Sequence, residues 1–433
     1  MSSLEDPAEK PTEKSRPVRS GPHDVITVLL DDGFRISGLE SASEGRNSHR
    51  KRSGTEIRHV AGIDAGSRLS LINGTYLIKT DPEAEPIEIE IEGSTAVAKP
   101  RNIELMLDGL PIHSEEIVGN KVLSAMGNSF TIRNERNQSG KSAKPSRRKK
   151  RKNIQVPKFR LKEKVTWIHG DTDETPSQDL DEESAEFIES IEQARNLDAA
   201  TQRTLHPDPE ELAQRVDTKG AEILSRGASD PNFLRWSISY ADLPWRPNFG
   251  LSREIPRNLH ANVDQLCSIP SVPITANLAR GPLAIIGPPE ARFASARHAI
   301  CSLVAFQKVG SLDLKVITTP ENSDSHWGWT SEFPSWASQA DNQIRVVIVD
   351  GIRAFDLAGL HHDKVTSGEM HMIILAEDES ELPDYFDIKL AVTNDGRATA
   401  TNQAGEQLEG IALGVGTRHA TKLMQRLNQI GSS

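Results

Sequence analysis

The sequence predicts a multidomain protein in which a small all-β domain is followed by an α/β domain with a largely parallel sheet. Short alternating apolar runs separated by Gly, Asn and Asp turns fill 23–135, whereas continuous apolar runs alternate with helical segments over 232–433. The 433 residues leave room for two or three domains, and a hydrophobic content of 36% indicates long disordered stretches between them.

The polar, Pro-rich segment 1–22 is predicted to be a disordered tail. Within 23–135, the alternation of isoleucine and glutamate from Ile87 to Ile91 predicts a strand with one buried face. The pair Asp108-Gly109 is typical of a tight hairpin turn. The charged run 41–56 is predicted to be a disordered insertion, and a small β-sandwich is the expected architecture.

Residues 136–185 are predicted to be a charged disordered linker. Between 141 and 164, twelve Lys and Arg residues accompany one acid, a net charge of +11; between 165 and 200, eleven acids accompany one Arg, a net charge of −10. The densest basic patch consists of Arg147, Arg148, Lys149, Lys150, Arg151 and Lys152. Its charge suits the phosphates of nucleic acid or of an anionic membrane, although no aromatic residue interleaves it for base stacking. The alternative is a solvated linker that pairs transiently with the neighbouring acidic stretch.

Residues 186–231 are predicted to form stalk-like helices. Apolar residues at helical spacing predict one buried stripe. The stripe consists of Phe187, Ile188, Ile191, Ala194 and Leu197. Pro207 ends this helix, and Asp208 is placed to cap the next one, with Pro209 at its first position.

The segment "PLAIIGPPEARFASARHAI" in the α/β domain predicts a buried strand, a turn at Gly287 and a helix, the shape that begins a phosphate-binding loop. Such a loop ends in Gly, Lys and Ser or Thr, and those three places here hold Arg292, Phe293 and Ala294. Pro288 and Pro289 also lack the backbone N–H groups that a phosphate cradle uses.

Asp350 ends the apolar run "VVIVD", where the Mg²⁺-binding acid of an ATPase would stand, but Gly351 occupies the place of the catalytic Glu. We therefore expect Gly287, Pro288, Pro289 and Asp350 to be a vestigial nucleotide loop whose Gly and Asp make turns. The chain is not expected to be an enzyme, and no cofactor is expected.

Two cysteines, Cys267 and Cys301, suit a reduced compartment. The N-terminus lacks the apolar core of a secretory signal, and no apolar run approaches the roughly 20 residues that span a bilayer. We expect a cytoplasmic protein, with a peripheral location at the inner face of the plasma membrane as an alternative. His361-His362-Asp363 has no second ligand cluster at zinc spacing, so no metal site is predicted, and the tryptophans at 327, 329 and 336 are expected to be packing anchors.

An ordered series of segments resembles a known family. The series includes "GPLAIIGPPEARFASARHAICSLVAFQKVGSLDLKVIT", "HWGWTSEFPSW", "VVIVDG" and "LPDYFDIKLAVT". Together they resemble the degenerate ATPase-like domain that precedes the motors of actinobacterial FtsK/SpoIIIE-type proteins, relatives of EssC/EccC of type VII secretion. "AGIDAGSRLSLINGTYLIKTD" and "MLDGLPI" in the β-rich part resemble the forkhead-associated (FHA) domains that open many of these proteins.

The departures from that family decide the expected function. The FHA phosphopeptide pattern is not reproduced: Lys79 and Thr80 stand in its Gly-Arg places, and Gly93-Ser94-Thr95 lacks the following Asn-Gly. The charged linker replaces a hydrophobic hairpin, and the chain stops where a first motor would begin. The resemblance implies a non-catalytic accessory or regulatory protein of an FtsK/SpoIIIE-type translocase, in DNA transport and cell division or in type VII-like secretion. Its expected partner is such an ATPase or a related secretion component; the alternative is a protein that binds DNA or anionic membrane through 147–152.

Overall fold

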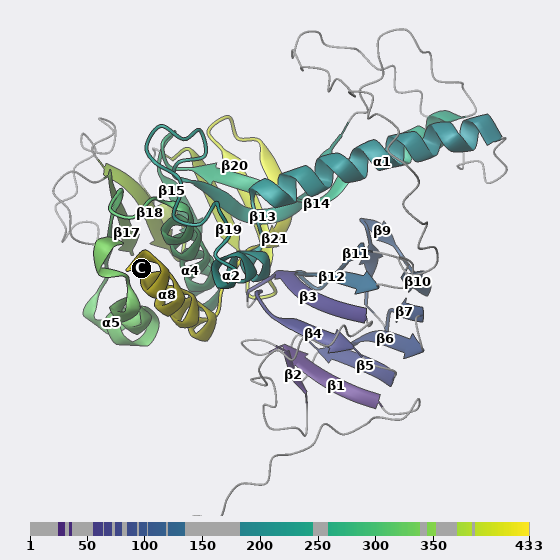
Figure 1. Ribbon diagram of the computed structural model, residues 1–433, viewed down its shortest axis with the longest axis horizontal. Helices are drawn as coiled ribbons and strands as arrows, with labels where there is room; N and C mark the ends of the chain where they lie inside the picture. Colours follow the sequence, from purple (N-terminus) through teal and green to yellow (C-terminus); the bar gives the residue numbers. More distant parts are fainter. Residues whose placement is uncertain are drawn as a thin grey trace, which may run out of the picture.

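The computed structural model describes residues 25–30, 34–36, 55–63, 65–71, 74–79, 85–92, 95–101, 103–117, 120–134, 182–245, 259–337, 344–351, 370–382 and 386–432. The predicted tail, the basic patch 147–152 and the His361-His362-Asp363 run lie outside these residues. Within them the β-rich part precedes a large mixed sheet with helices, as the sequence predicted at that level (Figure 1).

The β-rich part contains two six-stranded sheets. The first has the order β10 (Glu115–Ile117), β7 (Thr95–Lys99), β6 (Ile87–Glu92), β5 (Gly74–Lys79), β1 (Val25–Leu30) and β2 (Phe34–Ile36). The second has the order β4 (Arg68–Leu71), β3 (Thr55–Ala61), β12 (Asn128–Asn134), β11 (Asn120–Ala125), β8 (Met106–Leu107) and β9 (Leu110–Pro111). All described pairings are antiparallel except β1 with β5.

Local sequence explains much of this part. Ile87, Ile89 and Ile91 are buried on β6 while the intervening glutamates are not, as the alternation predicted. Asp108 and Gly109 both have positive φ and join β8 to β9 in the predicted two-residue turn. Strand β3 begins at Thr55, which is 3% exposed, so the end of the predicted insertion 41–56 belongs to the sheet.

The second part is built on a nine-stranded sheet, which corrects the prediction of a largely parallel one. Five strands are parallel: β19 (Ile388–Val392), β15 (Leu283–Ile286), β18 (Met370–Ala376), β17 (Ile344–Asp350) and β16 (Leu312–Ile317). Four strands extend the sheet antiparallel from β19: β20 (Arg397–Asn402), β21 (Gln407–Ala412), β13 (Arg235–Pro244) and β14 (Ser268–Asn277). The two long strands β13 and β14 were not predicted. Pro270 and Pro273 interrupt the apolar pattern of β14, which tolerates them because it is the edge strand.

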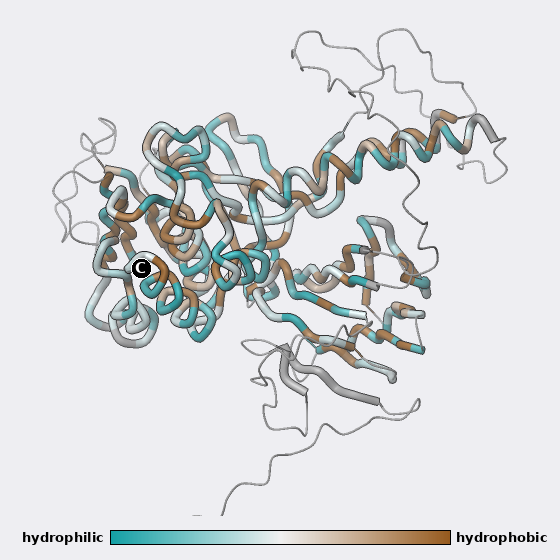
Figure 2. The backbone as a smooth tube through the Cα atoms, viewed as in Figure 1, coloured by the Kyte–Doolittle hydropathy of each residue, from teal (hydrophilic) through white to brown (hydrophobic). Residues whose placement is uncertain are grey.

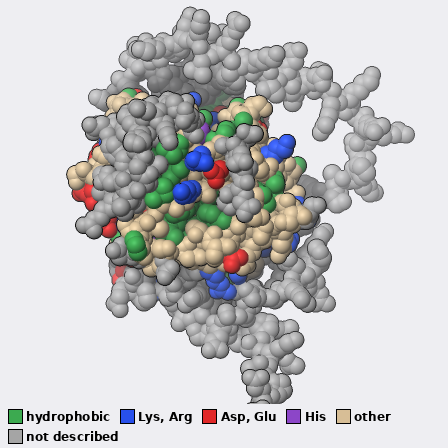
Figure 3. All heavy atoms as spheres, turned by 90° about the vertical axis from the view of Figure 1, so that its left-hand side faces the viewer, with side chains coloured by type: hydrophobic (Ala, Val, Ile, Leu, Met, Phe, Trp, Pro, Cys, Tyr) green, Lys and Arg blue, Asp and Glu red, His purple; other side chains and the backbone are tan. Residues whose placement is uncertain are grey.

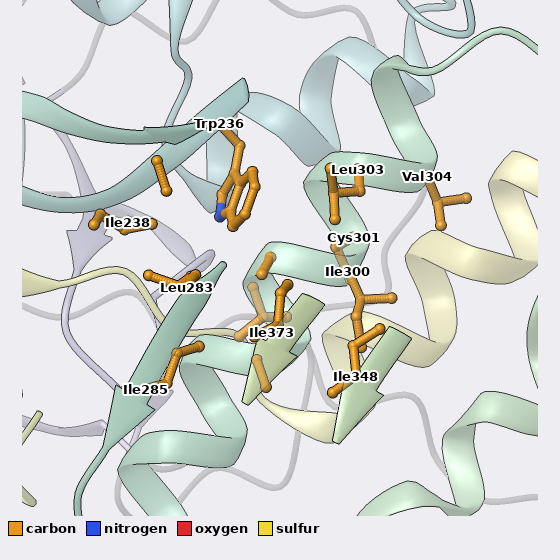
Figure 4. Packing of buried hydrophobic residues seen from close by; sticks show 14 of the residues in the cluster. Trp236, Ile238, Leu283, Ile285, Ile300, Cys301, Leu303, Val304, Ile348 and Ile373 are labelled. Atoms are coloured by element: carbon orange, nitrogen blue, oxygen red, sulfur yellow. The ribbon is translucent and has the colours of Figure 1, made fainter. Parts of the chain in front are cut away.

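Helices cover the sheet and extend from it. They are α1 (Glu182–Leu205), α2 (Pro209–Asp217), α3 (His260–Gln265), α4 (Pro289–Phe306), α5 (Pro320–Trp327) and α8 (Thr417–Gly431), with 3₁₀ turns η2 (Gly328–Glu332), η3 (Ser335–Ala337) and η4 (Glu379–Glu381). Every residue of α4 from Ala291 to Phe306 is buried, because the helix packs against the sheet, α2 and α8. Figure 4 shows Ile300 and Cys301 of α4 facing apolar side chains from β13, β15, β17 and β18.

The parallel strands carry apolar side chains on both faces. On β17, Val346 and Ile348 belong to the core under α4, while Val347 and Val349 belong to a second apolar cluster. Successive strand residues point to opposite faces, so the two clusters lie on opposite sides of the sheet. These strands are accordingly hydrophobic along most of their length in Figure 2. Seen from the side of α5 and β17, hydrophobic side chains also form a band on the surface, with a few charged groups near its centre (Figure 3).

Helix α1 confirms part of the predicted stripe and corrects the rest: Phe187 and Ile188 pack on the apolar cluster that contains Ile191. The helix projects along β14 in Figure 1, and Ile191 and Ala199 are buried there, at 1% and 5% exposure. Ala194 is exposed and Leu197 is 68% exposed. The buried side continues in steps of four through Arg195, Ala199 and Arg203, whose guanidinium donates to the carbonyls of Pro270 and Ser271. The helix starts at Glu182, within the last residues of the predicted linker, and acidic residues in a first turn are favourable.

The two parts of the molecule meet through their backbones. Gly62 N–H donates to the Ala412 carbonyl at 2.7 Å, and Gly62 forms a parallel bridge with Leu413. The turn after β11 lies against the turn after β19 so closely that a Cβ on Gly127 would lie 1.7 Å from the Asp395 carbonyl oxygen. Contacts this close are possible only at glycine, so the β-rich part and the mixed sheet are fitted directly together.

Candidate functional site

The segment that the sequence predicts to be a vestigial nucleotide loop joins β15 to α4 at the carboxyl end of the parallel strands, the edge where open α/β sheets usually bind ligands. Gly287 has a φ of +144°, and its N–H donates to the Ala376 carbonyl at the end of β18. A Cβ at this position would lie 2.1 Å from the Val392 carbonyl oxygen at the end of β19. Close packing of three strand ends therefore explains the glycine without a phosphate.

The first turn of α4 offers few donors. Pro288 is the N-cap residue and Pro289 the first helical residue, so neither has an N–H group to give. The N–H of Arg292 donates to the Pro288 carbonyl at 3.0 Å and is already used. Only Glu290 and Ala291 remain with first-turn N–H groups, where a phosphate-binding loop presents several.

The guanidinium group of Arg292 lies within the loop. Its Nη1 donates to the Gly287 carbonyl at 3.0 Å, and Nη1 and Nη2 both lie 3.2 Å from Oε1 of Glu377, just after β18. The Arg292 side chain is 7% exposed, whereas that of Glu377 is 65% exposed. The cationic group at this edge is thus buried, and it is neutralised within the chain.

Phe293 stands where a nucleotide-binding loop has its lysine, and it belongs to the core. It is 1% exposed, stacks on His326 with ring centroids 4.0 Å apart, and meets the edge of Trp327 at 5.7 Å. Ala294, in the place of the Mg²⁺-binding hydroxyl, is fully buried, and its carbonyl accepts the N–H of Val415. Burial lowers the pKa of His326, and the positive charge of Arg297 lowers it further. Both effects favour the neutral ring that stacks on Phe293.

Asp350 ends β17 and is 1% exposed. Its Oδ2 accepts three hydrogen bonds, from Thr318 Oγ1 at 2.8 Å, Trp327 Nε1 at 2.9 Å and Asn322 Nδ2 at 3.0 Å. The carboxylate holds α5 against the sheet edge. No group of three or more His, Cys, Asp or Glu side chains suited to a metal occurs among the residues that the structure describes.

The structure places the predicted nucleotide-loop residues at one edge of the sheet. What connects them there is a ring contact and a hydrogen bond of a core tryptophan. Gly287 follows β15 and Asp350 ends β17, with β18 between the two strands. Trp327 connects them, because it touches Phe293 and donates to Asp350. Trp327 and Trp329 are buried packing residues, as predicted. The contact between Arg292 and Glu377 was not predicted from the sequence. The available signal was an arginine in the place of the second glycine of a phosphate-binding loop.

Among known proteins, no protein-family model and no curated protein matches the sequence. Among solved structures, EssC (ATPases 2 and 3) from Geobacillus thermodenitrificans aligns with a TM-score of 0.32 and 11% identity, over 49% of this chain and 52% of that one. The cytoplasmic domain of the type VII secretion ATPase EccC of Thermomonospora curvata aligns with a TM-score of 0.32 and 10% identity, over 48% of this chain and 32% of that one. EccC (ATPases 2 and 3) of the same organism, in complex with a signal sequence peptide, has a TM-score of 0.30 and 11% identity, over 48% of this chain and 50% of that one.

This chain therefore spans about half or less of the length of those structures. Within the described residues, no helix combines the length and apolar character needed to cross a membrane.

Proposed function

We propose that this protein is a non-catalytic docking component of an FtsK/SpoIIIE-type translocase, in DNA transport or type VII-like secretion. The observation that carries the proposal is the filled nucleotide loop: Arg292 occupies the cradle and Phe293 is part of the core. In this state the basic side chain of the loop is paired within the chain and the lysine position is filled by core packing, which argues against a bound triphosphate. The segments that resemble the pre-motor part of this family indicate the partner, an ATPase of that type or a related secretion component.

The non-catalytic part is tested by measuring Mg²⁺-ATP binding and hydrolysis with the full chain. We expect no saturable binding and no turnover. The matched control is Asp350→Asn, which keeps most of the side-chain volume and changes the group that a metal would need. Turnover that is lost in an Asp350→Asn variant with the circular dichroism spectrum of the wild type would refute a non-catalytic role, whereas turnover that is equal in both proteins would come from a contaminant.

The docking part is tested by affinity capture from native lysate with the full chain and with a chain lacking 141–164. Recovery of the same FtsK/SpoIIIE-type ATPase by both proteins is the expected result, because the folded parts would then carry the contact. The second candidate, binding of DNA or anionic membrane, rests on the six consecutive basic residues 147–152. It predicts recovery of nucleic acid or lipid only by the full chain, and release of that material by salt.

A further inference from the structure

The contact between the β-rich part and the mixed sheet contains a group of facing charges. We call this group the interface cluster. It consists of Glu56 and Arg58 on β3, Arg68 on β4, and Asp208, Glu210 and Glu211 at the start of α2. Four carboxylates thus face two arginines. A buried apolar cluster lies beside the charged groups and consists of Val60, Ala61, Tyr240 and Leu413.

Most of the interface cluster is well paired. Arg58 Nε lies 2.6 Å from Glu56 Oε1, and its Nη1 lies 3.3 Å from Gln214 Oε1 and 3.7 Å from Glu211 Oε2. Glu211 also accepts from Arg215 Nε, one turn along α2, at 3.0 Å. The short contacts of Arg58 are thus made with groups other than Glu210, on which its charge acts only at longer range.

Glu210 is the poorly compensated member. Its side chain is 10% exposed, and it pairs with Arg68 at 3.6 Å between Oε1 and Nε, longer than a hydrogen bond. Arg68 is itself 50% exposed, so water screens part of its charge. Pro209 holds this end of α2 close to Gly66 of the β-rich part. A buried carboxylate with so distant a cation is destabilised when ionised and relieved when protonated.

We propose that the interface cluster is a proton-coupled clasp: Glu210 takes up a proton when the two parts close, so acidification through neutral pH tightens their contact and alkaline pH loosens it. The clasp would set how rigidly the β-rich part is held against the mixed sheet. It depends only on groups within this chain and does not rest on the proposed function.

The pKa directions agree with this geometry. Burial raises the pKa of Glu210 to about 7, against the opposing effect of Arg68, and burial raises the pKa of Asp208 to about 6. Both folded values exceed the unfolded ones, so the closed contact binds more protons than the open one between about pH 4.5 and 7. Stability of the contact is gained as pH falls through this range and is lost as pH rises.

Other titratable groups near the cluster do not reverse this sign at neutral pH. Burial lowers the pKa of His206, next to Asp208, to about 4, with further lowering by Arg235 and Arg226, so the ring is neutral in the folded protein. The unfolded histidine is also mostly neutral above about pH 6.5. Burial raises the pKa of Tyr240 on β13 well above its usual value, which keeps the phenol neutral.

The test is amide hydrogen exchange of the full chain at pH 6.5 and pH 8, corrected for the intrinsic pH dependence of exchange. The reporter is the peptide that contains Gly62, whose N–H donates across the contact to Ala412. From the raised pKa of Glu210, opening of the contact is expected to be about fourfold more frequent at pH 8 than at pH 6.5. The variant Glu210→Gln should remove most of the pH dependence and leave only the smaller share of Asp208, whereas Glu409→Gln, an exposed carboxylate on β21, should leave it intact.

A second variant keeps the proposal open to refutation if Glu210→Gln does not fold. Arg68→Gln removes the half-exposed cation beside Glu210, so the pH at which opening increases should move upward. Exchange of the Gly62 peptide that is independent of pH in the wild type would overturn the proposal. So would a pH dependence that survives undiminished in Glu210→Gln, or an unchanged midpoint in Arg68→Gln.

Discussion

The carboxyl edge of the parallel strands and the contact with the β-rich part differ in how completely their charged side chains are paired. At the edge, the buried Arg292 has one carboxylate and one carbonyl, and Asp350 accepts three donors through a single oxygen. At the contact, four carboxylates meet two arginines, and Glu210 has its cation 3.6 Å away. At the edge, both buried charged groups have close partners within the chain. At the contact, negative charge is in excess, and binding of a proton reduces it. The edge whose residues suggest a function in the sequence is therefore the one with the more completely paired charges.

The largest effect is expected from Phe293→Lys, which restores the lysine of a nucleotide loop. The ammonium would enter a site that is 1% exposed and lined by His326 and Trp327. We expect a loss of more than about 4 kcal/mol in the free energy of unfolding, and no gain of nucleotide binding. Urea denaturation measures the loss, and Phe293→Leu is the matched control, with a much smaller change. A stable lysine variant that binds ATP would show that the edge is not closed core.

The second prediction concerns pH, and its sign is opposite to that of the contact. His298 on α4 is 1% exposed, its Nε2 lies 3.0 Å from the Ser237 carbonyl, and burial lowers its pKa to about 4. The folded value lies below the unfolded one, so stability is complete above about pH 6.5 and is lost as pH falls toward 4. The loss from this group should approach about 3 kcal/mol. It is measured as the difference in denaturation free energy between wild type and His298→Gln at pH 7 and pH 4.5; an equal pH dependence in both proteins would contradict it.

The third prediction tests whether Gly287 serves packing. Gly287→Ala should lower the free energy of unfolding by about 2–3 kcal/mol, because of the positive φ and the nearby Val392 carbonyl. Gly328→Ala is the control: its φ of −52° and ψ of −30° suit alanine, and nothing lies near the added Cβ. Thermal or urea denaturation compares the two. Equal stability of both variants would mean that the turn is not held by the strand ends.

The smallest effect is expected from Glu377→Gln. The side chain is 65% exposed, yet it is the partner of the buried Arg292, so its neutralisation should reduce the free energy of unfolding by about 1 kcal/mol. Lys389→Met breaks a pair between Lys389 and the exposed Glu379 and should change it by less than about 0.5 kcal/mol. A Glu377 variant as neutral as the Lys389 variant would show that Arg292 does not need its partner.

The sequence indicated some elements well and misjudged others for specific reasons. The alternation at Ile87–Ile91 and the Asp108-Gly109 turn depend on neighbouring residues alone, and both predictions are confirmed. In α1, steps of three and of four residues were both compatible with the apolar pattern, and the contact with β14 selected the face of Ala199 rather than that of Leu197. Strand β14 escaped prediction because prolines are acceptable only on an edge, and the edge is a property of the whole sheet.

By itself, the sequence determined the succession of a β-rich part and an α/β part, and it determined which chemical groups the nucleotide loop lacks. Both follow from residue types and short-range periodicity, which need no knowledge of distant partners. The tertiary structure decided that the sheet is mixed, that Arg292 fills the loop, and that Glu210 is buried at a domain contact. Glu377 lies 85 residues after Arg292, and Arg68 more than a hundred before Glu210. The charge and burial of such pairs depend on how the whole chain folds back on itself, because desolvation is set by everything packed around them.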